Sequence, residues 1–444
     1  MIRIEGFDKA KQSLARKNAL ESRAGFPWLA TKIKQTFGKE LSPQQVVECI
    51  VGKVRDKGDE ALFYYARELE GVELDSLKVS QQEVLAAYDM VDEELIAALE
   101  AAVKKIRDFH LTYATKRDAV FVSQYLGRQI QPLDRVGLYV PGGTAAYPST
   151  VLMTAIPAGV AGVREIIMVS PPGKDGKIPA PTLVAADIVE VHRIFKVGGA
   201  QAIAALAFGT ESIPKVDKIC GPGNIFVTLA KKMVYGAVAV DGLQGPSEIM
   251  IVADEAANPL LCAADLLAQA EHDALASVIL ITTSLDLANQ VDKEVVKQLQ
   301  ELKRRSITAQ AVDRGITVLV SNIDEAVELA NLYAPEHLSL MVANASAIMP
   351  KILNAGCIFV GENSAVALGD YIAGPSHVLP TGGSAHFSSP LAVEDFLKTT
   401  NIIALDKAAV QKSGPAAMVM AKAEGLDAHA KSIEKRLQEL GDLK

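Results

Sequence analysis

Five short apolar runs in the middle of the chain decide its fold class. They are Val136-Gly-Leu-Tyr-Val140, Ile166-Ile-Met-Val-Ser170, Ile194-Phe-Lys-Val197, Lys218-Ile-Cys220 and Ala237-Val-Ala-Val240. Each run has the length and side chains of a buried strand, and helical patterns of about 10 to 15 residues separate them. This alternation predicts a parallel sheet with helices on its faces.

The same alternation starts again after residue 248. The further strand candidates are Ile249–Ala253, Val278–Thr282, Val318–Val320, Leu338–Val342 and Ile358–Gly361. Two doubly wound α/β units are therefore expected. No G-x-G-x-x-G motif follows a strand and no P-loop occurs, so a dinucleotide would not be held in the standard Rossmann manner.

The segments around these units have other patterns. The first third is mostly helical, with Ser42-Pro43 as a helix start, and Val120–Ile130 resembles a β-hairpin turning near Gly127. Residues 361–390 are rich in Gly, Ser and Pro, and a loop of that length in a compact enzyme is usually functional. Residues 392–444 have helical spacing but too few residues for a core, so we expect them to pack on the body or on another subunit.

Composition excludes several classes of protein. The 444 residues are 49% hydrophobic and carry a formal charge of −8, which argues against a nucleic-acid binder and against global disorder. The four cysteines form no C-x-x-C pair and are expected to be free thiols in a reducing compartment. The amino terminus lacks an apolar signal region and no apolar run is long enough for a membrane span, so we expect a cytoplasmic enzyme.

Three short segments combine residue types that carry chemistry. Gln269 and His272 end an apolar helix, and their spacing lets an amide oxygen and an imidazole reach one ion. Glu336-His337 places two bases at the edge of a strand. Asp370 and His377 stand among glycines in the long loop. Each segment by itself also fits a solvated helix end, a surface turn or a flexible loop.

Longer motifs carry a family resemblance across nearly the whole chain. They are Tyr139-Val-Pro-Gly-Gly143, Gly198-Gly-Ala-Gln201-Ala-Ile-Ala-Ala-Leu206, Gly221-Pro-Gly-Asn224, Gly245-Pro-Ser247-Glu248, Gln269-Ala-Glu-His272, Tyr333-Ala-Pro-Glu336-His337-Leu338, Gly369-Asp370-Tyr371 and His377-Val-Leu-Pro380-Thr-Gly-Gly383. In this order they resemble the histidinol dehydrogenase family, and several long motifs in register are far more specific than any one of them.

The resemblance implies a role for each matching residue. Zinc ligands would be Gln269, His272, Asp370 and His429, and the catalytic bases would be Glu336 and His337. Substrate contacts would include Ser247, His377 and Glu424 together with His337 and the zinc ligands. NAD contacts would be Tyr139, Gln201 and Asn224. The implied reaction is the NAD-linked, four-electron oxidation of L-histidinol to L-histidine through the aldehyde, the last step of histidine biosynthesis.

The resemblance also implies an architecture. It consists of two incomplete Rossmann-like domains with small terminal domains, in an intertwined homodimer with shared active sites. The expected parts are an N-terminal segment over 1–28, a first domain over 29–138 plus 249–391 with the zinc and catalytic residues, a second domain over 139–248 with the NAD contacts, and a tail over 392–444 swapped onto the partner.

Four positions depart from the commonest family pattern. They are Asp273, Pro375, Ser376 and His386, and none is an expected ligand or base. They affect the fine fit of the substrate, so a relative that oxidises another small amino alcohol or a sulfonated diol is the alternative. The carboxylate of Glu424 suits a cationic amino group and favours histidinol.

Other readings of the same residues remain open. A zinc hydrolase would use similar side chains, although no H-E-x-x-H motif occurs, and a non-catalytic binding module would leave the adjacent Glu336-His337 pair without a purpose. Within the dehydrogenase mechanism, His337 would take the proton in both steps and Glu336 would activate water. Cys220, beside the Gly221 turn, is a less favoured nucleophile for the second step.

Overall fold

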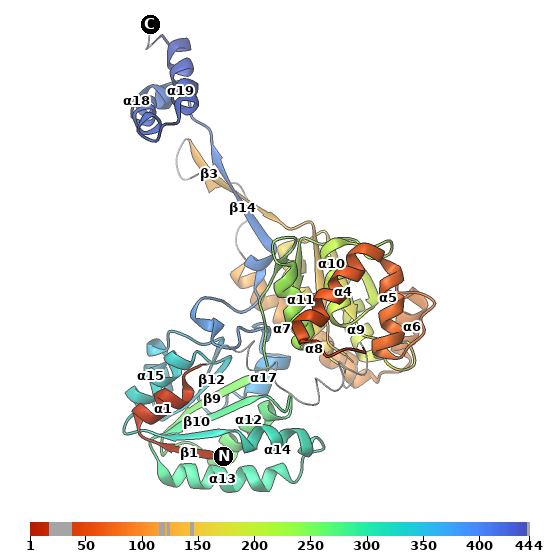
Figure 1. Ribbon diagram of the computed structural model, residues 1–444. Helices are drawn as coiled ribbons and strands as arrows, with labels where there is room; N and C mark the ends of the chain where they lie inside the picture. The colour runs from red at the N-terminus through yellow and green to blue at the C-terminus, as the bar shows by residue number, and fades with distance from the viewer. Residues whose placement is uncertain (17–37, 115–119, 122–124, 143–145, 442–444) are drawn as a thin grey trace. The chain divides into compact units, whose positions relative to one another are not determined.

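The computed structural model describes residues 1–16, 38–114, 120–121, 125–142 and 146–441. The chain divides into two compact units, one formed by residues 1–114 with 133–396, the other by residues 115–132 with 397–444. The first unit contains two parallel β-sheets and the helices that cover them, and the second contains a small antiparallel sheet and a pair of helices (Figure 1).

The first sheet has six parallel strands. In spatial order they are β1 (Ile2–Glu5), β11 (Ile316–Leu319), β10 (Ser277–Thr282), β9 (Glu248–Ala253), β12 (His337–Met341) and β13 (Cys357–Val360). Leaving β1 aside, the strands follow the 3-2-1-4-5 order of dinucleotide-binding sheets. The order reverses between β9 and β12, and such reversal points are where these sheets bind ligands.

Helices cover both faces of this sheet because its central strand is apolar on both sides. Ile249 and Ile251 of β9 enter a core with α12 and α13, whereas Met250 and Val252 enter a core with α1 and α15. The helical segments of this region are α1 (Phe7–Leu14), α12 (Pro259–Ala270), α13 (Leu285–Leu299), α14 (Arg305–Asp313), α15 (Ile323–Tyr333), α16 (Ala345–Ile348), η2 (Met349–Lys351), α17 (Val366–Tyr371) and η3 (Ser384–His386).

The second sheet has five parallel strands in the same 3-2-1-4-5 order. They are β6 (Arg193–Lys196), β5 (Glu165–Ser170), β4 (Arg135–Tyr139), β7 (Lys218–Cys220) and β8 (Ala239–Val240). The associated helical segments are α4 (Pro43–Lys57), α5 (Asp59–Tyr65), η1 (Ala66–Glu70), α6 (Gln81–Tyr88), α7 (Glu93–Tyr113), α8 (Pro148–Ala161), α9 (Ala180–Ile188), α10 (Gly199–Phe208), α11 (Ile225–Val234) and η4 (Val393–Phe396).

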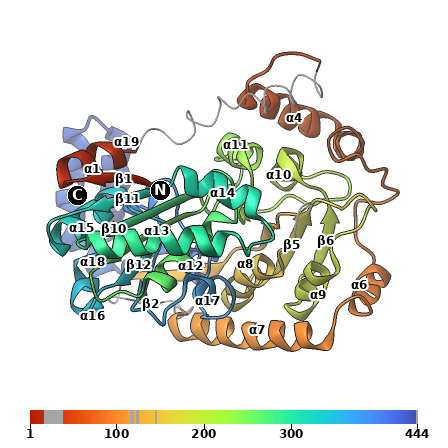
Figure 2. The ribbon, with the colours of Figure 1, turned by 90° about the horizontal axis from the view of Figure 1, so that it is seen from below.

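The helical first third packs on the second sheet. Helix α4 contacts α10 and α11, α6 contacts α9, and α7 lies beside α8 and α9 (Figure 2). The side chain of Ser42 accepts from the backbone N–H of Gln45 in a capping box, so the predicted helix start is confirmed.

This packing differs from the expected domain boundaries. The helices of residues 43–113 pack against helices of the second sheet, although they were expected in the first domain. Strand β1 pairs with β11 in the first sheet, so the described part of residues 1–28 does not form a separate terminal domain. Helix amphipathicity shows that a face is buried but not which sheet buries it. The remainder of the 1–28 segment lies outside the described residues.

The second unit contains the chain's antiparallel strands. They are β2 (Val120–Phe121), β3 (Leu126–Pro132) and β14 (Leu397–Ile403), in the order β14-β3-β2. The hairpin predicted over Val120–Ile130 is present, but Gly127 pairs inside β3 opposite Phe121 and does not form the turn. Helices α18 (Lys407–Ala423) and α19 (Asp427–Glu439) pack against each other.

Strands were predicted better where they are buried. All the strands expected from the apolar alternation are present, within a residue or two of the expected bounds. The strands β1 and β14 were missed because each is largely exposed and lacks an apolar run. The spacing of residues 392–444 had indicated helices throughout, but β14 occupies part of this segment.

Candidate active site

The expected pair of bases, Glu336 and His337, stands where strand β12 begins. Helix α15 ends at Tyr333, Ala334 turns the chain with a left-handed φ of 50°, and Pro335 leads into the strand. Glu336 is 7% exposed and His337 is 3% exposed. Both side chains therefore lie at the amino ends of parallel strands, opposite to the edge where open α/β sheets usually bind ligands.

The backbone of Glu248, the first residue of β9, holds both members of this pair. Its N–H donates to Oε2 of Glu336 over 2.8 Å, and its carbonyl oxygen lies 2.9 Å from Nδ1 of His337. A carbonyl only accepts, so Nδ1 of His337 carries the hydrogen. The other ring nitrogen, Nε2, is therefore the atom of His337 that is left for proton transfer.

Nε2 of His337 faces the carboxylate of Asp370, which the long loop supplies on helix α17. The nitrogen lies 3.6 Å from Oδ1 of Asp370 and has no hydrogen-bond partner among the described residues. Nδ1 of His377 lies 2.8 Å from the carbonyl oxygen of Asp370, and Nε2 of His377 lies 3.4 Å from the hydroxyl of Thr150 on α8. His337, Asp370 and His377 line one cavity of about 410 Å³.

The electrostatics couple these groups strongly. Burial lowers the pKa of His337, but the carboxylates of Glu336 and Asp370 outweigh burial and hold that pKa well above its ordinary value. Burial raises the pKa of Asp370, but His337 and then His377 and His272 outweigh it, so the net pKa is lowered. Burial raises the pKa of Glu336 and lowers that of His377.

Three of the expected zinc ligands lie in the first unit. Gln269 is buried at the end of α12, and His272 is exposed just beyond it. Because His272 acts on the charge of Asp370, the two side chains lie in one electrostatic neighbourhood. Amide oxygen, imidazole nitrogen and carboxylate oxygen suit zinc. Within the described parts of the chain, however, no three His, Cys, Asp or Glu side chains are grouped closely enough to hold a metal ion. The donors fit zinc only as an open set that needs a further ligand.

The remaining substrate and metal residues are divided between the units. Ser247 directly precedes β9 in the first unit, and its carbonyl accepts from the N–H of Ser277 over 2.9 Å. Glu424 and His429 belong to the second unit, where both are exposed at the junction of α18 and α19. Ligand-type side chains that are exposed in a small unit are available to another surface.

The expected NAD contacts gather at the carboxyl edge of the second sheet. Tyr139 ends β4, Gln201 lies in the first turn of α10 after β6, and Asn224 caps α11 after β7. The hydroxyl of Tyr139 accepts from the N–H of Gly199 over 3.2 Å. A Cβ on Gly221 would lie 2.1 Å from the carbonyl oxygen of Tyr139, so only glycine allows these two turns to meet.

Sequence reasoning missed Glu70 at this edge. Its Oε1 accepts from the N–H of Gly198 and from Nε2 of Gln201, each over 3.2 Å, while its Oε2 is buried without a partner among the described residues. Burial raises the pKa of Glu70 to about 7. Glu70 ends the π-helical turn η1, a conformation frequent at functional sites but invisible in a sequence pattern.

Comparison with known proteins agrees with this geometry. The family model described as histidinol dehydrogenase matches residues 34–437. The chain belongs to the histidinol dehydrogenase family. It is 53% identical to the histidinol dehydrogenase of Dehalococcoides mccartyi (strain CBDB1) over 98% of this chain and 99% of that one, and 50% identical to that of Halalkalibacterium halodurans over 89% and 94%. The crystal structure of histidinol dehydrogenase from Elizabethkingia anophelis superposes with a TM-score of 0.90 at 35% identity, covering 99% of both chains.

The histidinol dehydrogenase family is one of oxidoreductases. Two thiols of this chain, Cys220 and Cys357, lie near its motifs. Cys220 is fully buried at the end of β7, and burial holds its pKa well above the ordinary value. Cys357 was not singled out from the sequence, yet it pairs with His337 in the sheet register and lines the same cavity. Burial raises the pKa of Cys357 as well. Neither thiol is a ready thiolate, which disfavours the nucleophile alternative.

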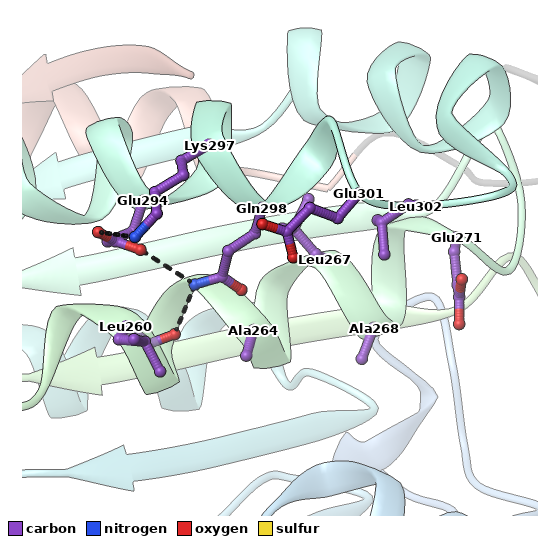
Figure 3. A pocket seen from close by; sticks show the side chains of 10 residues that line it. All are labelled: Leu260, Ala264, Leu267, Ala268, Glu271, Glu294, Lys297, Gln298, Glu301 and Leu302. Carbon is purple, nitrogen blue, oxygen red and sulfur yellow. Dashed lines mark hydrogen bonds and ion pairs between the residues drawn. The ribbon is translucent and has the colours of Figure 1, made fainter.

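A second hollow of about 440 Å³ lies between α12 and α13 (Figure 3). Its polar side chains bond to one another: Nε2 of Gln298 donates to the carbonyl of Leu260 over 3.1 Å, and Lys297 pairs with Glu294 over 3.5 Å. None of the expected site residues lines it. Along the described parts of the chain, no helix combines the length and apolar character needed to cross a membrane.

Proposed function

We propose that this chain oxidises L-histidinol to L-histidine through the aldehyde, with two hydride transfers to NAD, as the last step of histidine biosynthesis. Membership of the histidinol dehydrogenase family supports this reaction. The observation that carries the proposal is the buried Glu336-His337 pair, whose imidazole Nε2 faces Asp370 at a cavity of about 410 Å³.

His337 is the proton acceptor in both steps. Its Nδ1–H is held by the carbonyl of Glu248, so Nε2 receives the proton of the carbinol and later that of the hydrated aldehyde. Removal of that proton lets the carbon release hydride. The carboxylates of Glu336 and Asp370 raise the pKa of His337, which makes its Nε2 a stronger proton acceptor.

Gln269, His272 and Asp370, with His429, would hold zinc. Bound there, zinc would orient the substrate's amino and imidazole nitrogens, and through them the carbinol.

Glu336 activates the water that adds to the aldehyde. Its Oε2 is fixed by the N–H of Glu248, and burial raises its pKa, which brings a carboxylate closer to the strength of a general base. The cavity that His337 lines is the place where the aldehyde would stay bound between the two steps.

The remaining contacts orient the two reactants. Ser247, His377 and Glu424 contact the substrate, and the carboxylate of Glu424 suits its cationic amino group. Tyr139, Gln201 and Asn224 contact NAD at the carboxyl edge of the second sheet, where the strand order reverses between β4 and β7.

The active form is an intertwined homodimer with shared active sites. Its residues 392–444 cross to the partner, so Glu424 and His429 serve the neighbour's site. Their exposure in a unit that is small by itself supports this exchange. Unfolding and reassembling inactive His337→Asn with inactive His429→Asn should restore part of the activity, because a mixed dimer contains one intact site. Mixtures that stay inactive would place His429 in the same chain's site or outside any site.

The decisive measurement is the NADH formed per histidinol consumed. Two NADH for each histidinol, with histidine as the product, are expected for the four-electron reaction. One NADH with accumulating aldehyde would limit the enzyme to the alcohol step. No NADH from histidinol but NADH from a sulfonated diol would favour the alternative substrate, for which Glu424 offers no matching charge.

Zinc is tested by elemental analysis of His272→Asn. The side chain of His272 is exposed, so the variant should fold normally but lose the metal. His386→Asn, also exposed, is the matched control and should keep it. A full zinc content in His272→Asn would exclude the proposed ligand set.

A further inference from the structure

The backbone of Glu248 holds the catalytic pair, and hydrogen bonds to its side chain hold Glu248 itself in place. Nη1 and Nη2 of Arg16 donate to its two carboxylate oxygens over 2.6 and 2.7 Å, and the N–H of Gly382 donates to Oε1 over 3.2 Å. Paired, bidentate bonds of this kind fix direction as well as distance. Since Glu248 is only 6% exposed, its carboxylate would have little water to replace Arg16.

Arg16 also reaches the chain that leads into the other catalytic strand. Its Nε donates to the carbonyl of Tyr333 over 2.7 Å, Nη2 lies 3.4 Å from the carbonyl of Ala334, and the guanidinium stacks 3.8 Å from the centre of the Tyr333 ring. Ala334 has a left-handed backbone, which is unfavourable for a residue with a side chain. Such a conformation persists when its surroundings over-determine it, and Arg16 supplies part of that restraint.

One arginine thus controls both sides of the catalytic pair. Through Glu248 it fixes the backbone N–H that holds Glu336 and the carbonyl that holds His337, and through two carbonyls it fixes the turn just before Glu336. A displacement of about 1 Å in a reacting group can cost about a hundredfold in rate. Stability does not explain the pair by itself, because the desolvation of a buried ion pair largely offsets its attraction.

We infer that Arg16 and Glu248 are positioning residues for the proton transfers of this enzyme, and that the chain around α1 is therefore part of its active site. The inference rests on the proposed roles of Glu336 and His337. Neither Arg16 nor Glu248 exchanges protons with the substrate. They fix the tautomer of His337 and the direction of its Nε2.

The test is Arg16→Ala, assayed separately with histidinol and with the aldehyde. The kcat of both steps should fall about 10- to 100-fold, while the KM for NAD stays unchanged because its site lies on the other sheet. Millimolar guanidinium or ethylguanidinium should restore part of the lost kcat by refilling the gap. Arg16→Lys should be impaired too, since one ammonium cannot form two parallel bonds. Lys11→Ala, which removes an exposed ion pair from α1, is the matched control and should keep the normal kcat.

The double variant Arg16→Ala/Glu248→Gln separates positioning from two independent structural roles. If Arg16 and Glu248 act together on the catalytic pair, the double variant should lose no more kcat than the worse single variant. If their effects are independent, the two losses of kcat should multiply. The inference is wrong if Arg16→Ala keeps the normal kcat. It is equally wrong if the lost activity matches the fraction of unfolded enzyme at the assay temperature. If Arg16→Ala does not fold, Arg16→Lys with an unchanged kcat and a bound zinc would overturn it. If the unmodified enzyme forms no NADH from histidinol, the proposed function fails instead.

Discussion

The two parallel sheets share the strand order 3-2-1-4-5, β1 aside, but carry the residues proposed to be functional at opposite ends. The first sheet carries Glu336 and His337 at the amino end of β12, where both are buried and His337 lies 3.6 Å from Asp370. The second carries Tyr139 and Asn224 beyond the carboxyl ends of its strands, in turns held by backbone hydrogen bonds. Strand order therefore does not decide where chemistry occurs.

The two edges differ in what supports their polar groups. At the carboxyl edge, N–H groups at helix starts and a glycine turn leave room for a ligand. At the amino edge of the first sheet, the backbone of Glu248 holds the side chains of Glu336 and His337. We therefore expect substitutions at the amino edge of the first sheet to change chemical rates. Substitutions at the carboxyl edge of the second sheet should change cofactor binding.

The largest loss is expected for His337→Asn. Removal of a general base typically costs about a hundred- to ten-thousandfold in rate. The kcat should fall by that factor with histidinol and with supplied aldehyde alike, because Nε2 serves both steps. NADH formation from each compound measures this. The exposed Glu328→Gln should stay within about twofold. If only one of the two steps is slowed in His337→Asn, a different group is the base of the other.

Glu336→Gln should divide the two steps. The amide oxygen can still accept from the N–H of Glu248, so the shape remains while the base is lost. Aldehyde oxidation should fall about a hundredfold or more, and histidinol oxidation to the aldehyde much less. Single-turnover NADH formation from each compound is the measurement, with the exposed Glu328→Gln as control. Normal aldehyde oxidation in Glu336→Gln would remove its water-activating role.

Glu70→Gln tests the carboxyl edge of the second sheet. Loss of the charged acceptor for Gln201 should raise the KM for NAD about tenfold, the worth of one charge-assisted hydrogen bond, and leave kcat nearly unchanged. The exposed Glu73→Gln is the matched control. A fall in kcat at constant KM would show that the two edges are not functionally separate.

The same variant should change how stability depends on pH. The pKa of Glu70 is raised to about 7 from 4.5, so between these values the folded protein binds more protons than the unfolded chain. The free energy of unfolding of the unmodified protein should therefore decrease relative to Glu70→Gln as the pH rises from 4.5 to 7, by at most about 3 kcal/mol. Urea titrations at several pH values measure this, and a difference that is flat with pH would contradict it.

The smallest effect is expected at the thiol beside His337. Cys357→Ala should change both steps by no more than about twofold, because burial keeps this thiol protonated. The exposed Cys49→Ala is the control. If Cys357→Ala loses aldehyde oxidation alone, a thiol route for the second step must be considered again.

The sequence by itself determined the fold class and named candidate side chains for the first-unit site. Buried parallel strands are continuous apolar runs, so the strands of the two parallel sheets, except the exposed β1, could be found without tertiary information. The motifs around Gln269, Glu336 and Asp370 named side chains that do share one electrostatic neighbourhood or cavity. These residues were recognisable because each motif is local.

Only the tertiary structure decided which residues support that site. Arg16, Glu70 and Cys357 lie far along the chain from the residues they contact, and none belongs to a recognisable motif. The packing of residues 43–113 on the second sheet was likewise invisible, because an amphipathic helix shows its buried face but not its partner. Long-range contacts arise from the packing of whole surfaces, and a local pattern of side chains does not encode which surfaces meet.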